Sequence, residues 1–258
     1  MSEVRVGCSG WSYKHWRKGV FYPERLPAKD ELAFYATQFD TAEINGSFYR
    51  LPSESMVVGW RDRSPPGFLF AWKASRFITH MKRLLDPAEP LELMFSRADL
   101  LGDKLGPLLF QLPPQMQRND DRLAAFLDHL TLGRRHAFEF RHPSWYAPEV
   151  FALLEAHDCA LVISDHHHAP APWQRTATWA YVRGHGPLGR YWGRYPHETL
   201  VDWAGRVAAW SEQGDVYTYF DNDPEGAAPI DAEILRQLLG LAEPPAELRN
   251  ARPFRRAG

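Results

Sequence analysis

His136-Ala137-Phe138-Glu139-Phe140-Arg141 is typical of a buried strand that ends in charged side chains. Because successive side chains of a strand point to opposite faces, Ala137, Glu139 and Arg141 share one face, while Phe138 and Phe140 share the other. A strand buried on both faces should not carry a charged side chain unless that charge forms an ion pair or takes part in binding or catalysis. The stretch therefore predicts a polar pocket at the C-terminal end of a parallel sheet.

The same pattern recurs along the chain. Eight strands are predicted, at residues 4–8, 41–46, 68–74, 107–112, 136–141, 159–164, 179–184 and 215–221, and apolar residues at helical spacing lie between most of them. This alternation over about 250 residues is typical of an α/β fold, a TIM-like (β/α)8 barrel in a single domain. One irregular unit is expected at residues 166–178, after the sixth strand, where the composition is that of a loop.

A doubly wound open sheet is the alternative fold. It is disfavoured because Cys8-Ser9-Gly10-Trp11, after the first strand, lacks the glycine spacing of a phosphate-binding turn. The barrel domain is expected to span residues 1–241. Residues 242–258 are predicted to form a basic and poorly ordered tail.

Composition and charge limit the cellular location and the binding partners expected for the protein. The net charge of −2 over 258 residues implies no overall attraction to nucleic acid or to a membrane surface. The N-terminal residues lack a leader pattern, and no apolar run is long enough to span a membrane, so a cytoplasmic location is expected. Cys8 and Cys159 lie at opposite ends of parallel strands, too far apart for a disulfide, and two free thiols are predicted.

Polar side chains are predicted to converge at the C-terminal ends of the strands, where barrel enzymes have their active sites. On the last strand the alternation leaves open whether Asp221 or Asn222 points inward, and Asn222 is the one assigned to substrate binding. The other inward candidates are Glu43, Asn45, Lys73, Gln111, Glu139, Arg141, Asp165, Arg183 and His185.

The candidate catalytic residues are the acidic groups and the histidine: Glu43, Glu139, Asp165 and His185. His185 is the natural general acid or base, since its ordinary pKa lies near neutrality, although it could equally orient its neighbours by hydrogen bonding. The other polar groups are assigned to substrate binding. Arg141 and Arg183 could clamp a carboxylate or phosphate. Lys73 could form a Schiff base only if desolvated, and is otherwise an ion-pair partner.

The charges of this set balance. Three carboxylates (Glu43, Glu139 and Asp165) face three cations (Lys73, Arg141 and Arg183). The same residues could therefore form a self-paired structural network instead of a ligand site. A divalent metal on the carboxylates and His185 is chemically permissible, but the three cations argue against it, and no cofactor is expected.

Two loops above the predicted barrel mouth mix aromatic and basic residues, at residues 9–23 and 75–83. Trp11 and Tyr13 of the first loop are assigned to substrate binding, because aromatic and basic side chains together suit sugar rings, stacked bases or phosphates. The alternative is a lid in which the aromatic side chains, Trp16 and Tyr22 among them, pack on the barrel rim.

Six motifs follow one another in the order of a known family: Gly7-Cys8-Ser9-Gly10-Trp11, Glu43-Ile44-Asn45-Gly46-Ser47-Phe48-Tyr49, Lys73-Ala74-Ser75-Arg76-Phe77-Ile78-Thr79-His80, Leu109-Phe110-Gln111-Leu112-Pro113-Pro114, Glu139-Phe140-Arg141-His142-Pro143-Ser144-Trp145 and Tyr219-Phe220-Asp221-Asn222-Asp223. The chain resembles the YecE-like family, also called domain of unknown function 72, over residues 4–240. The resemblance implies a TIM-like barrel and no particular activity. The chain departs from the family at Asp221, where Asn is more common.

Two functions compete on these observations. The first is an enzyme, with hydrolase, lyase and isomerase all open, whose pocket binds a small anionic or sugar-like substrate. The second is a nucleic-acid-binding or phosphodiester-cleaving protein, by analogy with barrel-fold repair nucleases. Substrate identity and oligomeric state do not follow from the sequence.

Overall fold

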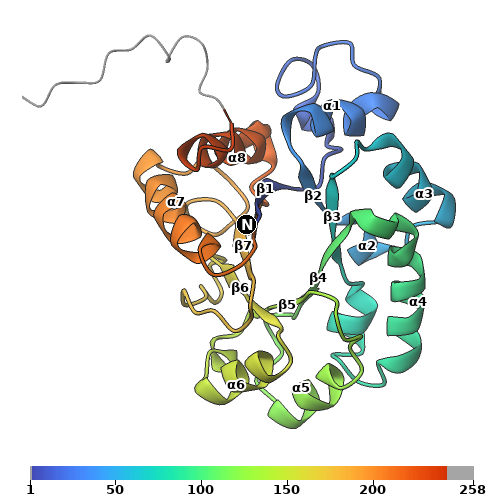
Figure 1. Ribbon diagram of the computed structural model, residues 1–258, viewed down its shortest axis with the longest axis vertical. Coiled ribbons are helices and arrows are strands. Elements are labelled where there is room, and N and C mark those ends of the chain that lie inside the picture. Colours follow the sequence, from blue (N-terminus) through green and yellow to red (C-terminus); the bar gives the residue numbers. More distant parts are fainter. Residues whose placement is uncertain (1, 243–258) are drawn as a thin grey trace, which may run out of the picture.

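Eight parallel strands close into a barrel in the computed structural model, which describes residues 2–242 (Figure 1). Each strand pairs with the next, and β8 pairs with β1 to complete the ring. The closed ring confirms the TIM-like barrel and excludes the open doubly wound sheet. The strands are β1 (Val4–Ser9), β2 (Thr41–Ile44), β3 (Leu69–Lys73), β4 (Leu105–Gln111), β5 (His136–Glu139), β6 (Ala160–Ser164), β7 (Ala180–Gly184) and β8 (Val216–Phe220).

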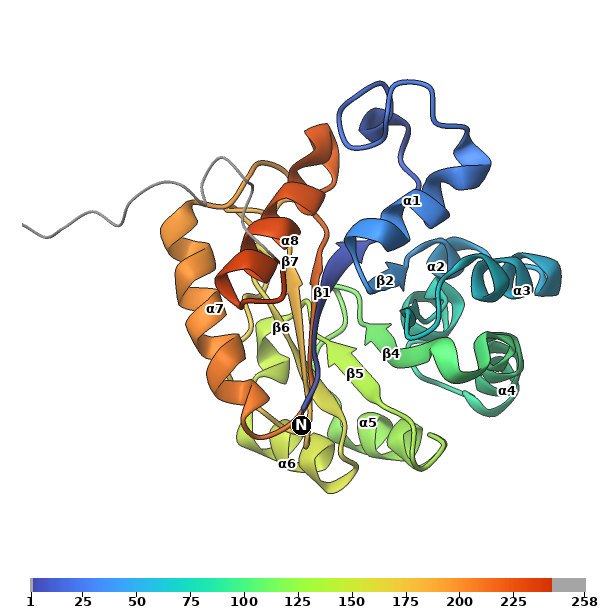
Figure 2. The same cartoon turned by 45° about the horizontal axis from the view of Figure 1, so that its top comes forward.

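Helices surround the ring of strands (Figures 1 and 2). Ser53 and Asn119 cap two of them, since each side chain accepts a hydrogen bond from a backbone N–H of the first turn. The helices are α1 (Glu31–Gln38), α2 (Gly46–Tyr49), α3 (Glu54–Arg63), α4 (Ala88–Ala98), α5 (Asp120–Leu127), α6 (Pro148–Ala156), α7 (His197–Ser211) and α8 (Ala227–Leu238). Within residues 2–242, the segment between β6 and β7 contains no helix, which confirms the irregular unit.

Alternation along the strands divides the apolar side chains into two cores. Phe138 and Phe140 belong to the larger core, which lies between the sheet and the helices. Ala137 belongs to the smaller core inside the barrel, together with Tyr181 and Tyr219. The barrel interior thus contains tyrosine hydroxyls as well as carbon, and the hydroxyl of Tyr219 lies 2.7 Å from that of Thr41. A polar group can therefore be placed on the inward face without facing a purely apolar core.

The loop between β1 and α1 forms a packed lid. Trp16 and Tyr22 are almost fully buried and belong to the larger core. The indole N–H of Trp16 donates to the backbone oxygen of Asp223 at 2.8 Å, which ties this loop to the segment after β8. These two aromatic side chains are therefore structural, as the lid alternative predicts.

Three further expectations concern the rest of the chain. Cys8 and Cys159 are buried, unpaired thiols, as predicted. Among the described residues, no helix is both long and apolar enough to cross a membrane. The predicted tail, apart from its first residue, lies outside the described residues.

Candidate functional site

Arg183, on the inward face of β7, is the centre of a buried polar ring at the C-terminal end of the barrel. Its side chain is 0% exposed. The guanidinium donates to both carboxylate oxygens of Glu43, at 3.0 and 2.7 Å, to Glu139 at 2.7 Å and to Asp221 at 2.8 Å. The Ser9 hydroxyl is a further acceptor at 2.9 Å. The planar fork of arginine suits this arrangement, because it presents five N–H groups in fixed directions.

Arg141, which follows β5, is the second cation of the ring. Its Nε donates to Glu139, and its Nη1 donates to the hydroxyl of Tyr191 at 2.7 Å. Nη2 lies 3.1 Å from Nε2 of His185. The side chain is only 3% exposed, so the candidate clamp of two arginines is occupied by the protein's own carboxylates.

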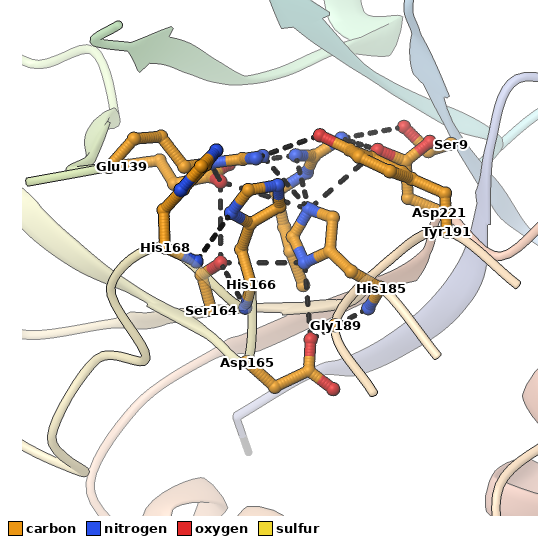
Figure 3. A network of polar contacts seen from close by, with 12 residues as sticks. Ser9, Glu139, Ser164, Asp165, His166, His168, His185, Gly189, Tyr191 and Asp221 are labelled. Atoms are coloured by element: carbon orange, nitrogen blue, oxygen red, sulfur yellow. Dashed lines mark hydrogen bonds and ion pairs between the residues drawn. The ribbon is translucent and has the colours of Figure 1, made fainter. Parts of the chain in front are cut away.

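His185 is held in one tautomer by its neighbours (Figure 3). Its Nε2 lies 3.1 Å from the N–H groups of both Arg141 and Arg183, which can only donate. Nε2 is therefore the acceptor, and the proton is on Nδ1, 3.2 Å from the carboxylate of Asp165. Burial, with Arg141 and Arg183 close by, lowers the pKa of His185 well below its usual value, although Glu139 opposes this effect. This geometry fits the orienting role better than the acid–base role.

The His185 imidazole is expected to stay neutral, with its proton on Nδ1, between pH 5 and pH 8. Nitrogen-15 NMR of the histidine rings would check this, because the two ring nitrogens differ strongly in shift in the neutral form. The pKa of His185 is lower in the folded than in the unfolded protein. His185 should therefore make the fold less stable as the pH falls below about 6.5, the usual pKa of histidine. Titration of the ring between pH 6 and pH 7 would contradict the assignment.

The two buried glutamates are ionised through pairing. Burial alone would raise the pKa of Glu43 and Glu139, but the charge of Arg183 on Glu43, and of Arg141 and Arg183 on Glu139, outweighs it and lowers both pKa values. Asp165 is different: burial raises its pKa to about 6, against hydrogen bonds from Tyr195 and from the backbone N–H of His185. Glu43 and Glu139 are thus ionised at neutral pH and neutralise the arginines.

A cavity of about 1330 Å³ opens beside this ring, over the ends of β1 to β4. We call it the open half of the barrel mouth. Its floor includes Asn45, Lys73, Gln111 and Asp221, and its walls include Trp11 and further aromatic side chains. The remaining wall aromatics are Tyr13, Phe48, Tyr49, Trp60 and Tyr191.

The cations of the open half differ from those of the ring. Lys29, Arg63, Lys73 and Arg76 line the cavity, and among residues 2–242 none of the four forms a salt bridge. The cavity's two carboxylates already have partners: Asp221 pairs with Arg183, and Asp223 lies 3.1 Å from His15. The open half therefore presents an excess of positive charge around a recess with aromatic walls.

Two predicted placements are wrong. The inward residues of β6 are Ala160, Val162 and Ser164, so Asp165 belongs to the outward face; it reaches His185 only because it follows the last residue of the strand. The side chain of Asn222 donates to the backbone oxygen of Gly193 at 2.7 Å and to Asp231 at 2.8 Å, outside the ring. Asp221 occupies the inward position instead, because it continues the face of Tyr217 and Tyr219.

Four side chains of the ring are not among the residues predicted from the sequence. Ser9 and Tyr181 donate to Glu43, the latter at 2.6 Å, and Ser164 lies 3.3 Å from Glu139. Ser9, Ser164 and Tyr181 lie on inward faces, so strict alternation could have identified them. Tyr191 comes from the long loop after β7, and no periodic pattern marks it. With Asp221 included, the ring has four carboxylates, one more than the sequence count.

The remaining predicted binding residues lie in the open half. Asn45 donates to the Ser9 hydroxyl at 2.6 Å, which connects the cavity floor to the ring. Trp11 packs edge-on against Trp60, with ring centroids 5.4 Å apart, so it forms part of the wall. Within residues 2–242, no group of three or more His, Cys, Asp or Glu side chains is arranged to hold a metal ion.

A family model described as "Protein of unknown function DUF72" matches residues 5–254. Among curated proteins, the UPF0759 protein YecE of Escherichia coli K12 is 28% identical over 146 residues, which are 56% of this chain and 50% of that protein. The matched segment thus spans half the length of this curated relative.

Solved structures share the fold. The crystal structure of a DUF72 family protein from Thermotoga maritima MSB8 is 29% identical and superposes with a TM-score of 0.84, covering 92% of this chain and 99% of the other. A DUF72 family protein from Enterococcus faecalis V583 superposes with a TM-score of 0.80 at 20% identity, covering 93% and 97%.

Proposed function

The chain belongs to the DUF72 family, and we propose that its barrel is the scaffold of an enzyme that binds a small anionic substrate, sugar-like or carboxylic, in the open half of the mouth. The observation that carries this proposal is the contrast between two sets of cations. Arg141 and Arg183 are paired inside the ring, whereas Lys73 and Arg76 face the cavity without a carboxylate partner among residues 2–242. Lys73 is buried, whereas Arg76 is exposed, and a buried cation that lacks an internal counter-ion gains most from an anion supplied by a ligand.

The walls suit a compact organic anion. The ring of Phe48 lies 4.8 Å from Nζ of Lys73, and Tyr49 lies 6.0 Å from the guanidinium carbon of Arg76. Aromatic faces hold cations in place and also cover the apolar side of a sugar ring. Asn45 and Gln111 add neutral hydrogen-bonding groups at the floor. Few polar groups among aromatic walls are typical of small-molecule sites.

The nucleic-acid alternative receives less support from the same residues. A single strand binds by stacking bases on exposed aromatic side chains along a basic groove. Trp16 and Tyr22 of the first loop are buried in the core, and Arg17 pairs with Glu31 at 2.6 Å. Lys73 is buried in the recess, whereas Lys29, Arg63 and Arg76 are exposed side chains that line it.

Phosphorylated sugars and small carboxylates are expected to raise the melting temperature of the protein, whereas their uncharged parents should not. Each anion is tested beside its parent, for example ribose 5-phosphate beside ribose. Replacing Arg76 by glutamine should weaken binding of any stabilising anion by at least about tenfold, which corresponds to the loss of one charge-assisted contact. Isothermal titration calorimetry gives the affinities.

The matched control is Arg206→Gln, which removes an exposed arginine on α7, paired with Asp202 at 2.8 Å. Its anion affinities should equal those of the unmodified protein. The proposal fails if no anion of the panel binds, or if Arg76→Gln and Arg206→Gln bind equally well. Binding of a single-stranded oligonucleotide that weakens steeply with salt, without binding of small anions, would favour the nucleic-acid alternative.

A further inference from the structure

Lys73 occupies an unusual position at the end of β3. Its side chain is 7% exposed, and its Nζ points into the open half. The backbone is fixed in place, since the hydroxyl of Ser47 donates to the carbonyl oxygen of Lys73 at 2.6 Å. Among residues 2–242, neither a hydrogen bond nor a salt bridge involves Nζ, and the nearest recorded contact is the ring of Phe48 at 4.8 Å.

The ring explains why this lysine is unpaired. Glu43 and Glu139 give their oxygens to Arg183, Arg141, Ser9 and Tyr181. Asp221 gives one oxygen to Arg183 at 2.8 Å, and the other lies 3.3 Å from the amide nitrogen of Asn45. The oxygens of these carboxylates therefore already have hydrogen-bond partners other than Lys73. The lysine is buried near a second cation, Arg183.

This environment increases the fraction of Lys73 that is present as the neutral amine. Burial, followed by the charge of Arg183, lowers the pKa of Lys73 to about 8. At pH 7 roughly a tenth of such a lysine is uncharged, against well under a thousandth of an ordinary one. The other titratable groups that act on it are His80, Glu43, Glu139 and Asp221.

We propose that Lys73 is a nucleophile that forms a Schiff base with a carbonyl group of the anionic substrate. The assignment deepens the proposed function and rests on it: Arg76 would hold the anionic group, while Lys73 attacks the carbonyl carbon. A desolvated lysine beside another cation is the usual form of an amine nucleophile, and Lys73 meets both conditions through its burial and through Arg183.

The step balances without any further reactant. The lone pair of Nζ forms a bond to the carbonyl carbon, nitrogen loses one of its two protons, and the carbonyl oxygen takes up a proton to give a carbinolamine. Nitrogen then loses its remaining proton as the hydroxyl leaves with a second proton, so that amine and carbonyl become imine and water, with no oxidation or reduction. Asp221 is suited to carry these protons, because it lines the same cavity and burial raises its pKa, although Arg183 opposes this shift.

Borohydride reduction tests the proposal on the whole chain. The protein is incubated with dihydroxyacetone phosphate or pyruvate, reduced, and analysed by intact mass and by peptide mapping. One adduct per chain is expected, on Lys73, at least tenfold above any other lysine. Trapping should rise with pH to a half-maximum near 8, and Lys73→Arg should abolish it while Lys82→Arg, which alters an exposed pair with Asp86, should not.

The outcomes separate this proposal from the proposed function. Glycerol 3-phosphate, which has no carbonyl, should bind the same cavity and protect Lys73 from trapping. If glycerol 3-phosphate binds and Arg76→Gln weakens it, but no adduct forms on Lys73, the Schiff base is wrong and the anion site stands. Adducts spread evenly over surface lysines would also overturn the Schiff base. If neither binding nor trapping occurs, both proposals fail.

Discussion

Replacing Arg183 by methionine is expected to lower the free energy of unfolding by about 3–5 kcal/mol, the cost of breaking a buried ion pair by removing one partner. The substitution leaves Glu43, Glu139 and Asp221 without the cation that they share in a fully buried ring. Such a loss is a large part of the total stability of a typical domain. Urea unfolding followed by circular dichroism would measure it.

The pH dependence of this loss identifies its cause. In the unmodified protein the folded pKa values of Glu43 and Glu139 are lowered, so their contribution to stability is present at neutral pH and is lost as the pH falls through the folded pKa. Without Arg183, burial is opposed only by Lys73 at Glu43 and by Arg141, His185 and Lys73 at Glu139, so both pKa values rise from those of the unmodified protein. The deficit of Arg183→Met should therefore shrink between pH 7 and pH 5, because protonation relieves the unpaired charge.

Two further variants complete this experiment. Arg183→Lys keeps the charge but not the planar fork, and should fall between the methionine variant and the unmodified protein. Arg206→Met, which removes an exposed pair to Asp202, should cost less than about 1 kcal/mol. A deficit of Arg183→Met that is independent of pH would mean that lost packing, and not unpaired charge, is the cause.

The inward set of the ring could be predicted because barrel strands obey strict alternation. Glu139 and Arg183 are charges flanked by apolar neighbours in strands buried on both faces, and Glu43 follows the same rule. Asp165 was misplaced because it shares a face of β6 with Leu161 and Ile163, and this face points outward, toward the helices. Alternation itself continues one residue beyond the strands, since His185 after β7 and Asp221 after β8 keep the inward face.

The pairing within the ring could not be predicted from the sequence. Alternation predicts which side chains point inward, but not that Arg183 donates to Glu43, Glu139 and Asp221 while Lys73 reaches none of these carboxylates. Which side chains pair depends on how far along the barrel axis each residue lies relative to residues on the other strands. The position of the open half depends on loops such as the one that carries Tyr191, whose conformation no period specifies. The balanced number of charges in the sequence therefore did not reveal that, within residues 2–242, the ring cations are paired and the cations of the open half are not.

Glu139→Gln is the second substitution with a large expected effect, a loss of about 3 kcal/mol. Glu139 is the carboxylate that pairs with Arg141, and it also accepts from Arg183 at 2.7 Å. Glutamine keeps the shape but removes the charge, and its amide group would face guanidinium donors. Arg141 would then be a buried cation with no salt-bridge partner among residues 2–242.

The double variant Glu139→Gln with Arg141→Met tests whether this pair acts as one ionic unit. Removing the uncompensated cation should restore stability relative to Glu139→Gln alone, by about 1 kcal/mol or more, which is a normal coupling energy for residues in one network. Simple addition of the two single losses would contradict the pairing.

Because Lys73 and Arg76 lie in the open half, the double variant should still bind a stabilising anion within about threefold of the unmodified affinity. Loss of that binding would instead place Arg141 in the ligand site, and the ring and the cavity would then have to be treated as one functional unit.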